Sequence, residues 1–392
     1  MSLIKKRFDI EKISMYTISM KRLVIVSGEL SGDTHGARLI DQLLAIKPDL
    51  EISGIGGDGM ISAGMKAIFH IKEMAFLGLG EIVRQLPFIV HVYRKLITHI
   101  KTVRPDAVIL IDYPGFNMKI AKAVKKTGIP VIYYISPQLW AWGKNRVKKL
   151  KRTVDLMLVL FPFEEEFYKQ FGIHAKFTGH PLVDRYHQLV HPKQTSGTND
   201  KVLGILPGSR KQELELLLPD MIKTANILYE QGSISQALVA RVSHIDSVHY
   251  DPYIEGYPWC RLVSIPMDQL YNQLDIAIVA SGTATLETAY FQVPMIIVYR
   301  VHPLTWYLGR LFVKLQHIGL ANIVAGIILA PEFLQNNFKP EYAASALAGL
   351  LIAEENGRAR KKMKIIQDKL GTTGASEKAA QAIIEFLSTH ND

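Results

Sequence analysis

Short aliphatic runs, each ending in small or polar residues, recur along this chain and most constrain its fold. Such runs are typical of strands buried on both faces of a parallel sheet, and the helix-like segments between them supply the crossovers that parallel strands need. In the first half of the chain the runs are 21–29, 106–116, 129–136, 154–164 and 176–184. In the second half they are 201–210, 235–242, 260–265, 274–283 and 293–300.

A polar segment rich in turn formers, His191 to Asp200, separates the two sets of runs. A chain of 392 residues also suits two domains better than one. We predict two doubly wound α/β domains, which would form a cleft if the carboxyl ends of their strands faced each other. Ser376 is the predicted N-cap of the last helix. The predicted parts are an extension at 1–20, domains at 21–190 and 201–365, and a C-terminal helix within 366–392 that returns to the N-terminal domain.

The composition limits which cellular compartment and which class of binding partner the chain is suited to. A single cysteine, Cys260, excludes a disulfide framework and a cysteine-rich metal site, and it fits a reducing compartment. The N-terminus lacks a secretory apolar region, and the longest charge-free run, 315–331, is shorter than the ~20 residues of a spanning helix, so we expect a cytoplasmic protein. The net charge of +10 favours an anionic partner, namely nucleic acid, an acidic membrane surface or a phosphorylated substrate.

The run that ends in Ser281-Gly282-Thr283 has the character of an anion site. Gly282 allows close backbone approach, the helix that follows offers free N–H groups, and two hydroxyls lie beside them. Glu287 lies one helical turn beyond Thr283 and could accept hydrogen bonds from a ribose diol. The alternative is a capped helix whose acid only complements the helix dipole.

A second strand-to-helix junction, Ile205 to Leu214, contains Gly208 and Ser209 in a turn followed by Arg210, which could pair with phosphate through two donors. The alternative is a turn with a solvated arginine. Two such junctions in one domain favour a nucleotide site over either alternative taken alone.

The first domain contains a third turn of this kind at 26–36, where Glu29 and Ser31 could meet a sugar or an acceptor phosphate and where Asp33 could instead be a cap. The segment Gly54 to Gly59 matches the dinucleotide fingerprint in form, but the broken segment that follows it does not read as the required helix, so we discount it. Asp112 follows an apolar strand, where its carboxylate could act as a general base or could instead cap the turn into the next helix.

Two segments suit a lipid surface. The basic residues between 144 and 152 follow two tryptophans and could meet anionic lipid or, with less support, nucleic acid; they also fit a solvated helix that buries Val147, Leu150 and Val154. The apolar stretch Met74 to Leu96 could lie on a membrane or line an acyl-chain groove, although buried core is the commoner use and the one we favour from the residues alone.

Taken in order, the motifs resemble those of the lipid-A-disaccharide synthases, glycosyltransferases of Gram-negative bacteria with the two-domain GT-B fold. The resemblance covers nearly the whole chain from about Lys21. The matching strings are GELSGD, GIGG, LGLGEI, IDYPGFN, SPQLWAWGKNRVKK, LFPFEEEFY, GHPLVD, LPGSRKQE, ASGTATLE, VPMIIVYRVHPLT, LANIVAG and PEFLQ.

The resemblance implies a hexosyltransferase that joins UDP-2,3-diacylglucosamine to 2,3-diacylglucosamine 1-phosphate, with inversion and release of UDP. It implies that Asp112 is the general base on the acceptor 6-hydroxyl. The residues implied for the nucleotide sugar are Arg210, Ser281, Gly282, Thr283, Glu287, Asn322 and Gln335. Those implied for the acceptor or its sugar are Glu29, Ser31 and Asn117.

The chain departs from the family pattern at four positions. Leu30 stands where alanine is usual, Tyr113 and Gly115 replace a more usual form of the motif around Asp112, and Gly143 stands where arginine is frequent. The first three departures could reshape the acceptor side of the site. With glycine at position 143, the chain lacks the cation that would contact phosphate there.

Inversion calls for one in-line displacement, with one base and with stabilisation of the departing UDP. The chain has no Asp-x-Asp motif to hold a divalent ion, so we expect Arg210 and helix N-termini to bear that charge, with no metal and no cofactor. The acylated substrates imply peripheral contact with the cytoplasmic face of the inner membrane, and a homodimer is a further expectation. The alternatives are an enzyme similar to UDP-N-acetylglucosamine 2-epimerase and a non-catalytic basic protein that binds membrane or RNA.

Overall fold

The computed structural model describes residues 21–74, 86–142, 144–191, 193, 200–302, 306 and 316–389. The predicted extension at 1–20, the Gly143 departure, part of the Met74 to Leu96 stretch and most of the predicted linker lie outside the described residues.

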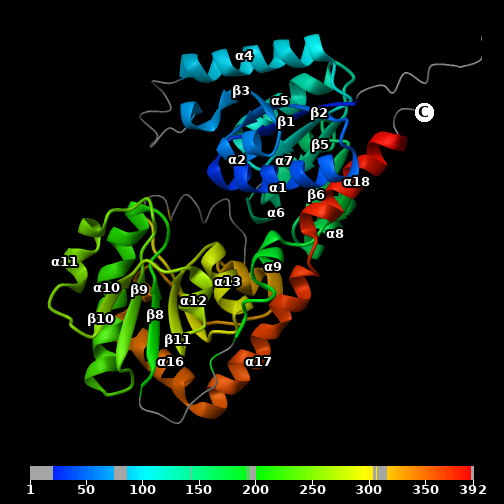
Figure 1. The fold of residues 1–392 in the computed structure, drawn as a ribbon. Coiled ribbons are helices and arrows are strands. Elements are labelled where there is room, and N and C mark those ends of the chain that lie inside the picture. Colours follow the sequence, from blue (N-terminus) through cyan, green and yellow to red (C-terminus); the bar gives the residue numbers. More distant parts are fainter. Residues whose placement is uncertain are drawn as a thin grey trace, which may run out of the picture. The chain divides into compact units, whose positions relative to one another are not determined.

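Two parallel sheets with flanking helices form the fold, which confirms the predicted α/β class (Figure 1). The first sheet has the order β3-β2-β1-β4-β5-β6-β7. Because β1 pairs with β2 on one side and with β4 on the other, the winding of this sheet reverses between β1 and β4. Its strands are β1 Arg22–Ser27, β2 Glu51–Gly56, β3 Lys66–His70, β4 Ala107–Ile111, β5 Val131–Tyr134, β6 Leu156–Val159 and β7 Ala175–Phe177.

The second sheet has the order β10-β9-β8-β11-β12-β13. Here β8 pairs with β9 and with β11, so the winding reverses between β8 and β11. Its strands are β8 Val202–Leu206, β9 Gln236–Ala240, β10 Cys260–Val263, β11 Ile276–Ala280, β12 Met295–Tyr299 and β13 Glu332–Leu334.

Helices connect the strands of both sheets, as the alternating pattern predicts. Those of the first half are α1 Leu30–Ile46, α2 Asp58–Ser62, α4 Leu86–Val103, α5 Pro114–Lys125, α6 Leu139–Trp142, α7 Lys144–Leu150, α8 Pro162–Gln170 and α9 Pro181–Tyr186. Those of the second half are α10 Lys211–Glu230, α11 Asp251–Ile254, α12 Met267–Tyr271, α13 Thr283–Tyr290, α15 Leu320–Ala325, α16 Pro340–Leu351, α17 Ala353–Leu370 and α18 Ala375–Thr389.

The central strands of the second sheet explain why the aliphatic runs are continuous. All five residues of β8 and of β11 are buried, because helices cover both faces of a parallel sheet. The helices α10 and α16 contact each other beside this sheet and bury residues such as Leu217, Met221 and Leu347 against it. Burying one such side chain contributes about 1.5–3 kcal/mol, so these strands form the core on which the adjacent turns are built.

The aliphatic runs did not predict three of the strands, namely β2, β3 and β13. Gly54 interrupts the apolar run of β2 at φ +153°, and an added Cβ there would overlap the carbonyl of Ile25 on the neighbouring strand. The edge strand β3 has two exposed residues, and β13 contains only three residues, each partly buried. Edge strands are half solvated or short, so they lack the continuous apolar run on which the prediction relied.

The last helix begins in a different way from the prediction. Ser376, the predicted N-cap of α18, lies inside that helix and is buried. The carboxylate of Asp184 instead accepts hydrogen bonds from the N–H groups of Gly374 at 2.6 Å and Ala375 at 3.1 Å. A charged cap from a distant residue fixes the start of α18 more firmly than a local serine would.

The chain divides into two compact units, residues 1–132 with 383–392, and residues 133–382. In the first unit, the ammonium group of Lys21 donates to the carbonyl of Leu387 in α18 at 3.1 Å. No helix among the described residues is long and apolar enough to cross a membrane. The domain boundaries given above stay predictions.

Arg360 on α17 ties together the loops that lead into β11 and β12. Its buried guanidinium donates to the carbonyls of Gln292, Leu274 and Asp275 at 3.1–3.3 Å and to Asn356 Oδ1 at 2.7 Å. Hydrogen bonds from a charged group are strong, and their loss leaves buried acceptors without partners.

We therefore expect Arg360→Ala to lower the free energy of unfolding by about 3 kcal/mol in urea denaturation. Arg358→Ala on the same helix is the matched control. Arg358 pairs with Glu354 and Glu355 at the surface, where such pairs contribute about 0–1 kcal/mol. Equal losses for the two variants would contradict a special role of Arg360.

Candidate functional site

The reversal point of the first sheet brings two predicted site residues together. Ser27 of β1 lies in register with Ile111 of β4, so the chain that follows each strand leaves the sheet at the same edge. Glu29 follows β1 and begins α1, and Asp112 follows β4 immediately. Ligands of open parallel sheets bind at such points, where the carboxyl ends of adjacent strands lead in opposite directions.

Asp112 and Tyr113 both adopt left-handed backbone, with φ of 45° and 47°. This conformation is costly for residues other than glycine, about 1 kcal/mol or more each, and it persists where neighbouring contacts enforce it. Asn117 supplies such contacts, because its side-chain amide donates to the carbonyls of Ile111 at 3.0 Å and Asp112 at 2.8 Å. Asn117 is completely buried, so it shapes the turn from behind; the predicted contact with an acceptor stays a prediction.

The environment of Asp112 suits proton acceptance. Burial raises the pKa of its carboxyl, and the nearby negative charge of Glu29 raises it further, while the Tyr113 backbone N–H opposes the shift. A carboxylate with a raised pKa is a better base than a solvated one. This environment is compatible with the general base that the sequence predicts at Asp112, and that role stays a prediction.

Tyr113, one of the departures from the family pattern, explains why residue 28 is a glycine. A Cβ added to Gly28 would overlap the Tyr113 ring, so the ring packs directly on the backbone between β1 and α1. The side chains of Glu29 and Ser31 are exposed beside this contact, as is Leu30. Two of the three predicted acceptor residues, Glu29 and Ser31, are thus open to a ligand, whereas Asn117 is buried.

Asp33 has a structural role that also accounts for the motif at 54–59. Its buried carboxylate accepts hydrogen bonds from the N–H groups of Gly57 at 2.6 Å, Gly59 at 3.0 Å and Met60 at 3.1 Å. It lies at the start of α2, the place where a dinucleotide-binding turn would hold pyrophosphate. The expectation that no helix follows the fingerprint was wrong, because the short helix α2 begins at Asp58, but the amides at its start are taken by the protein's own acid.

The reversal point of the second sheet collects the predicted nucleotide residues in the same way. Because β8 and β11 are neighbours, the turn that follows β8 and carries Arg210 and the turn Ser281 to Thr283 that follows β11 leave the same edge of the sheet. β9 lies on the other side of β8, and His244 beyond its end contacts the carbonyl of Ser209 at 2.9 Å.

The turn around Arg210 is held by Glu213. One carboxylate oxygen of Glu213 accepts from the N–H groups of Ser209 at 3.0 Å and Arg210 at 3.2 Å, and the other accepts from the Arg210 guanidinium at 3.0 Å. The Arg210 side chain is 80% exposed, so this ion pair is weak and the guanidinium keeps further donors for a phosphate. Gly208 at φ +107° provides the bend.

The turn at the end of β11 presents open backbone. Gly282 has φ +152°, and an added Cβ would meet nothing within 4 Å, so the space above it is free for a ligand. No side chain caps α13, whose first residue, Thr283, is exposed. The hydroxyl of Ser281 donates to the carbonyl of Ile318 at 2.9 Å and can still accept a hydrogen bond.

A buried network stands behind this turn. Asn322 is 0% exposed, and its amide donates to the Ala330 carbonyl and to Glu332 Oε1, both at 2.8 Å, while its oxygen accepts from the N–H groups of Leu329 at 2.7 Å and Ala330 at 3.1 Å. All of its hydrogen-bonding groups are thus used inside the protein. Asn322 shapes the site, and direct contact with a nucleotide stays a prediction.

Glu332 continues this network to Ser281. Its carboxylate accepts from the N–H groups of Ile318 and Gly319, both at 2.9 Å. The carbonyl of Ile318 in turn receives the Ser281 hydroxyl, so a chain of bonds runs from Asn322 through Glu332 to the turn. Networks of this kind fix one backbone arrangement when every member is satisfied.

Glu287 lies on α13 one turn beyond Thr283, as predicted. Burial raises the pKa of its carboxyl, and the positive charge of Arg185 and a hydrogen bond from the Tyr271 hydroxyl at 3.2 Å oppose that shift. A partly buried carboxylate that keeps acceptor capacity is suited to a diol.

Gln335 completes the predicted set from the far side of the sheet. With its amide oriented to satisfy both groups, it donates to the Val301 carbonyl and accepts from the Val301 N–H, both at 3.1 Å. It thereby fixes the end of β13 to the segment after β12, and its own backbone is left-handed at φ 51°. This role is structural, and a nucleotide contact stays a prediction.

Sequence reasoning missed Glu213, Glu332 and Tyr271. Glu213 could have been found, because an acid three residues after the start of a helix is the spacing of a capping box. Glu332 and Tyr271 gave no such signal, since their partners are distant in sequence. In the basic segment Val147 and Leu150 are buried on α7, as the interpretation of an inward apolar face predicts, whereas Val154 is buried beyond the end of that helix.

Comparison with known sequences points to one family. The sequence profile described as lipid-A-disaccharide synthetase matches residues 23–386. The lipid-A-disaccharide synthase of Syntrophus aciditrophicus is 39% identical over 378 residues, which cover 94% of this chain and 99% of that protein. The enzyme of the same name from Geobacter metallireducens is 38% identical over 384 residues, covering 95% and 99%.

Comparison with solved structures agrees on the fold alone. An S. aureus MnaA structure with UDP has a TM-score of 0.62 at 13% identity, covering 94% of this chain and 97% of the other. The calicheamicin glycosyltransferase CalG4 has a TM-score of 0.58 at 14% identity, covering 94% and 99%. These proteins share the GT-B arrangement of two parallel-sheet domains.

The network behind Ser281 makes a testable prediction at Asn322. Asn322→Asp keeps the shape but replaces the donor to Glu332 by a second carboxylate, and two such groups repel each other unless they share a proton. We expect the melting temperature to fall more at about pH 8 than at about pH 5 relative to the unaltered protein. Asn322→Ala, which cannot share a proton, should lose about the same stability at both values. A pH-independent deficit in the aspartate variant would count against the network.

Proposed function

We propose a glycosyl transfer for this chain, which belongs to the lipid-A-disaccharide synthase family. UDP-2,3-diacylglucosamine is the donor, 2,3-diacylglucosamine 1-phosphate is the acceptor, and the products are a β-1,6-linked disaccharide 1-phosphate and UDP. What supports this most is the family match over nearly the whole chain, joined to two sheet reversal points that carry the expected anion-binding turns and base.

The donor site lies at the second reversal point. Arg210 would pair with the pyrophosphate, and the backbone N–H groups at Gly282 and Thr283 would bind a phosphate oxygen, aided by the dipole of α13. Ser281 would add a hydroxyl, and Glu287 would accept from the ribose diol. The open space above Gly282 and the exposure of Arg210 support these roles.

The acceptor site lies at the first reversal point. Asp112 would take the proton of the acceptor 6-hydroxyl as that oxygen attacks the anomeric carbon of the donor. Glu29 and Ser31, both exposed, would contact the acceptor or the transferred sugar. Asn117 would hold the strained turn, so that the carboxylate of Asp112 keeps its direction.

The reaction inverts the anomeric configuration, so one displacement with one base suffices. The C–O bond from the donor anomeric carbon to UDP breaks as the bond to the acceptor oxygen forms, and the electron pair leaves with UDP. Arg210 and the N–H groups at the start of α13 stabilise the developing negative charge; one preorganised donor of this kind lowers such a barrier by about 3 kcal/mol.

Substrates with long acyl chains call for peripheral contact with the cytoplasmic face of the inner membrane. The basic helix α7 and the residues after it, up to Arg152, and the stretch Met74 to Leu96 are the segments we assign to this contact, although residues 75–85 lie outside the described part. Dimerisation stays a prediction.

The two alternatives are not favoured. The structural neighbours include UDP-N-acetylglucosamine 2-epimerases, but at 13% identity they show the fold alone, whereas the synthases are 35–39% identical over most of the chain. One assay distinguishes the three interpretations. Incubation with the two acylated glucosamine substrates should give UDP and a disaccharide. An epimerase would instead convert UDP-N-acetylglucosamine to its C2 epimer, and a non-catalytic protein would release no UDP.

The mechanism without a metal predicts full turnover in excess chelator. A loss of turnover that magnesium restores would overturn that mechanism.

Removal of the base is the sharpest test of the acceptor site. Asp112→Asn should lower kcat by about 10²- to 10⁴-fold, because general-base catalysis contributes that much, while the Kd for UDP stays unchanged. Titration calorimetry with UDP and initial rates with both substrates measure the two quantities. A variant with substantial turnover would remove Asp112 from this role.

The proximity of Glu29 to Asp112 predicts a pH effect. The active form of Asp112 is the carboxylate, so kcat/KM falls as the pH drops through its raised pKa. Glu29→Gln removes a negative neighbour, which lowers that pKa and should move the acid limb of the kcat/KM profile to lower pH. Ser31→Ala is the control, since it changes a neighbouring contact without changing charge. An acid limb that stays in place, or moves to higher pH, would contradict the coupling.

A further inference from the structure

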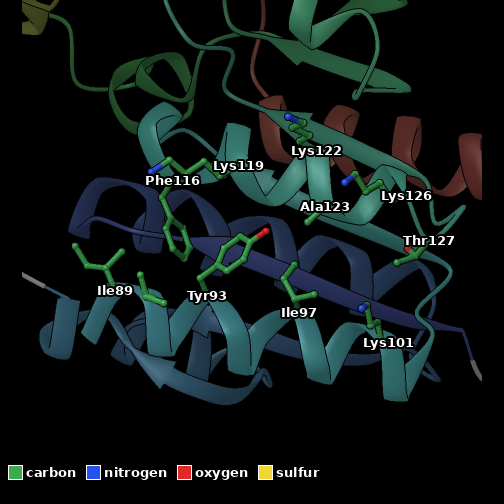
Figure 2. A pocket seen from close by; sticks show the side chains of 11 residues that line it. Ile89, Tyr93, Ile97, Lys101, Phe116, Lys119, Lys122, Ala123, Lys126 and Thr127 are labelled. Carbon is green, nitrogen blue, oxygen red and sulfur yellow. The ribbon is translucent and has the colours of Figure 1, made fainter. Parts of the chain in front are cut away.

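A groove between α4 and α5 contains none of the residues assigned to the donor or the acceptor site, and part of its α4 wall belongs to the Met74 to Leu96 stretch that we assign to membrane contact. It has a volume of about 630 Å³, within the ~300–1,000 Å³ of typical ligand pockets, and side chains from both helices line it (Figure 2). Its lining residues are Ile89, Val90, Tyr93, Ile97, Lys101, Phe116, Lys119, Lys122, Ala123, Lys126 and Thr127.

The floor of the groove is apolar because each helix presents a stripe at helical spacing. Ile89, Tyr93 and Ile97 recur every four residues on α4, whereas the residues that α4 buries in the core, such as Val92 and Leu96, lie on a different stripe. Phe116 and Ala123 face them from α5, as Figure 2 shows. The stripe from Ile89 to Lys101 is ~18 Å long, which suits an extended hydrocarbon chain.

Lysines form the rim of this groove: Lys101, Lys119, Lys122 and Lys126. All four are exposed, and within the described part of the chain no ion pair involves them. Neither α4 nor α5 contains an aspartate or glutamate, so neither helix offers a counter-charge. An apolar floor with a cationic rim is complementary to an amphipathic anion.

We propose that this groove binds an anionic membrane phospholipid, with one acyl chain along the floor and the headgroup phosphate on the lysine rim. Exposed apolar residues continue from the end of the groove, since Leu86 is 55% and Val90 is 40% exposed, so the bound chain would lie beside side chains that also enter the bilayer. The site deepens the membrane contact proposed for the Met74 to Leu96 stretch and does not depend on the glycosyl transfer.

The first test removes the charge of the rim. Binding is measured by sedimentation with vesicles of phosphatidylcholine that contain phosphatidylglycerol, against phosphatidylcholine alone. Lys122→Gln with Lys126→Gln should weaken binding by about 30-fold, or ~5-fold per lysine, because each cation near an anionic surface contributes about that much. The control pair, Arg94→Gln with Lys125→Gln, lies on the same helices outside the groove and should weaken binding by less. Equal weakening by both pairs would show diffuse attraction and overturn the groove.

The second test fills the floor without changing charge. Ala123→Trp should abolish the part of vesicle binding that survives high salt, which screening leaves to apolar contact, while low-salt binding persists. Unchanged salt-resistant binding would overturn the proposal. The proposal would also be overturned if Ala123→Trp bound vesicles normally but had a raised KM for the acceptor in phospholipid-free detergent. The groove would then hold an acyl chain of the acceptor. Asp112→Asn, inactive by design, should bind vesicles like the unaltered protein, so failure of the catalytic proposal stays distinguishable.

Discussion

The lateral pairing of β1 with β4, and of β8 with β11, is the constraint on which the rest of the structure depends. Each pair marks the point where the winding of a parallel sheet reverses, so the segments that follow the two strands leave the sheet together. Buried aliphatic residues on both faces make these strands rigid. The acid at one reversal point and the proposed anion-binding turns at the other therefore follow fully buried strands.

Carboxylates of the protein itself satisfy many of the backbone amides that these turns expose. Asp33 binds the start of α2, Glu213 binds the turn of Arg210, and Asp184 binds the start of α18. Asp33 and Asp184 thereby mark turns that only stabilise the fold, whereas Glu213 holds a turn whose arginine keeps further donors. The start of α13 has no side-chain cap, and the guanidinium of Arg210 is held only by an exposed ion pair, so both remain open to an external anion.

The local part of the site could be predicted and the supporting part could not. Asp112 and Ser281 directly follow strands that the aliphatic runs reveal, and Arg210 follows such a strand after a short turn, so position along the chain was enough to select them as candidates. Asn322 and Gln335 were named through family resemblance, but their side chains bind backbone inside the protein, a geometry that no local pattern encodes. The predicted cap at Ser376 failed because a distant carboxylate competes for the same amides and carries a full charge.

The sequence by itself determined the parallel α/β class, the strands of both sheet centres and the residues at their carboxyl ends, because continuous apolar burial and turn chemistry are local properties. Only the tertiary structure decided that Asp33 fills the turn at Gly57, that Glu332 links Asn322 to Ser281, and that two cationic helices enclose a groove. Each of these depends on contacts between residues far apart in the chain, and such contacts exist only once the sheets have formed.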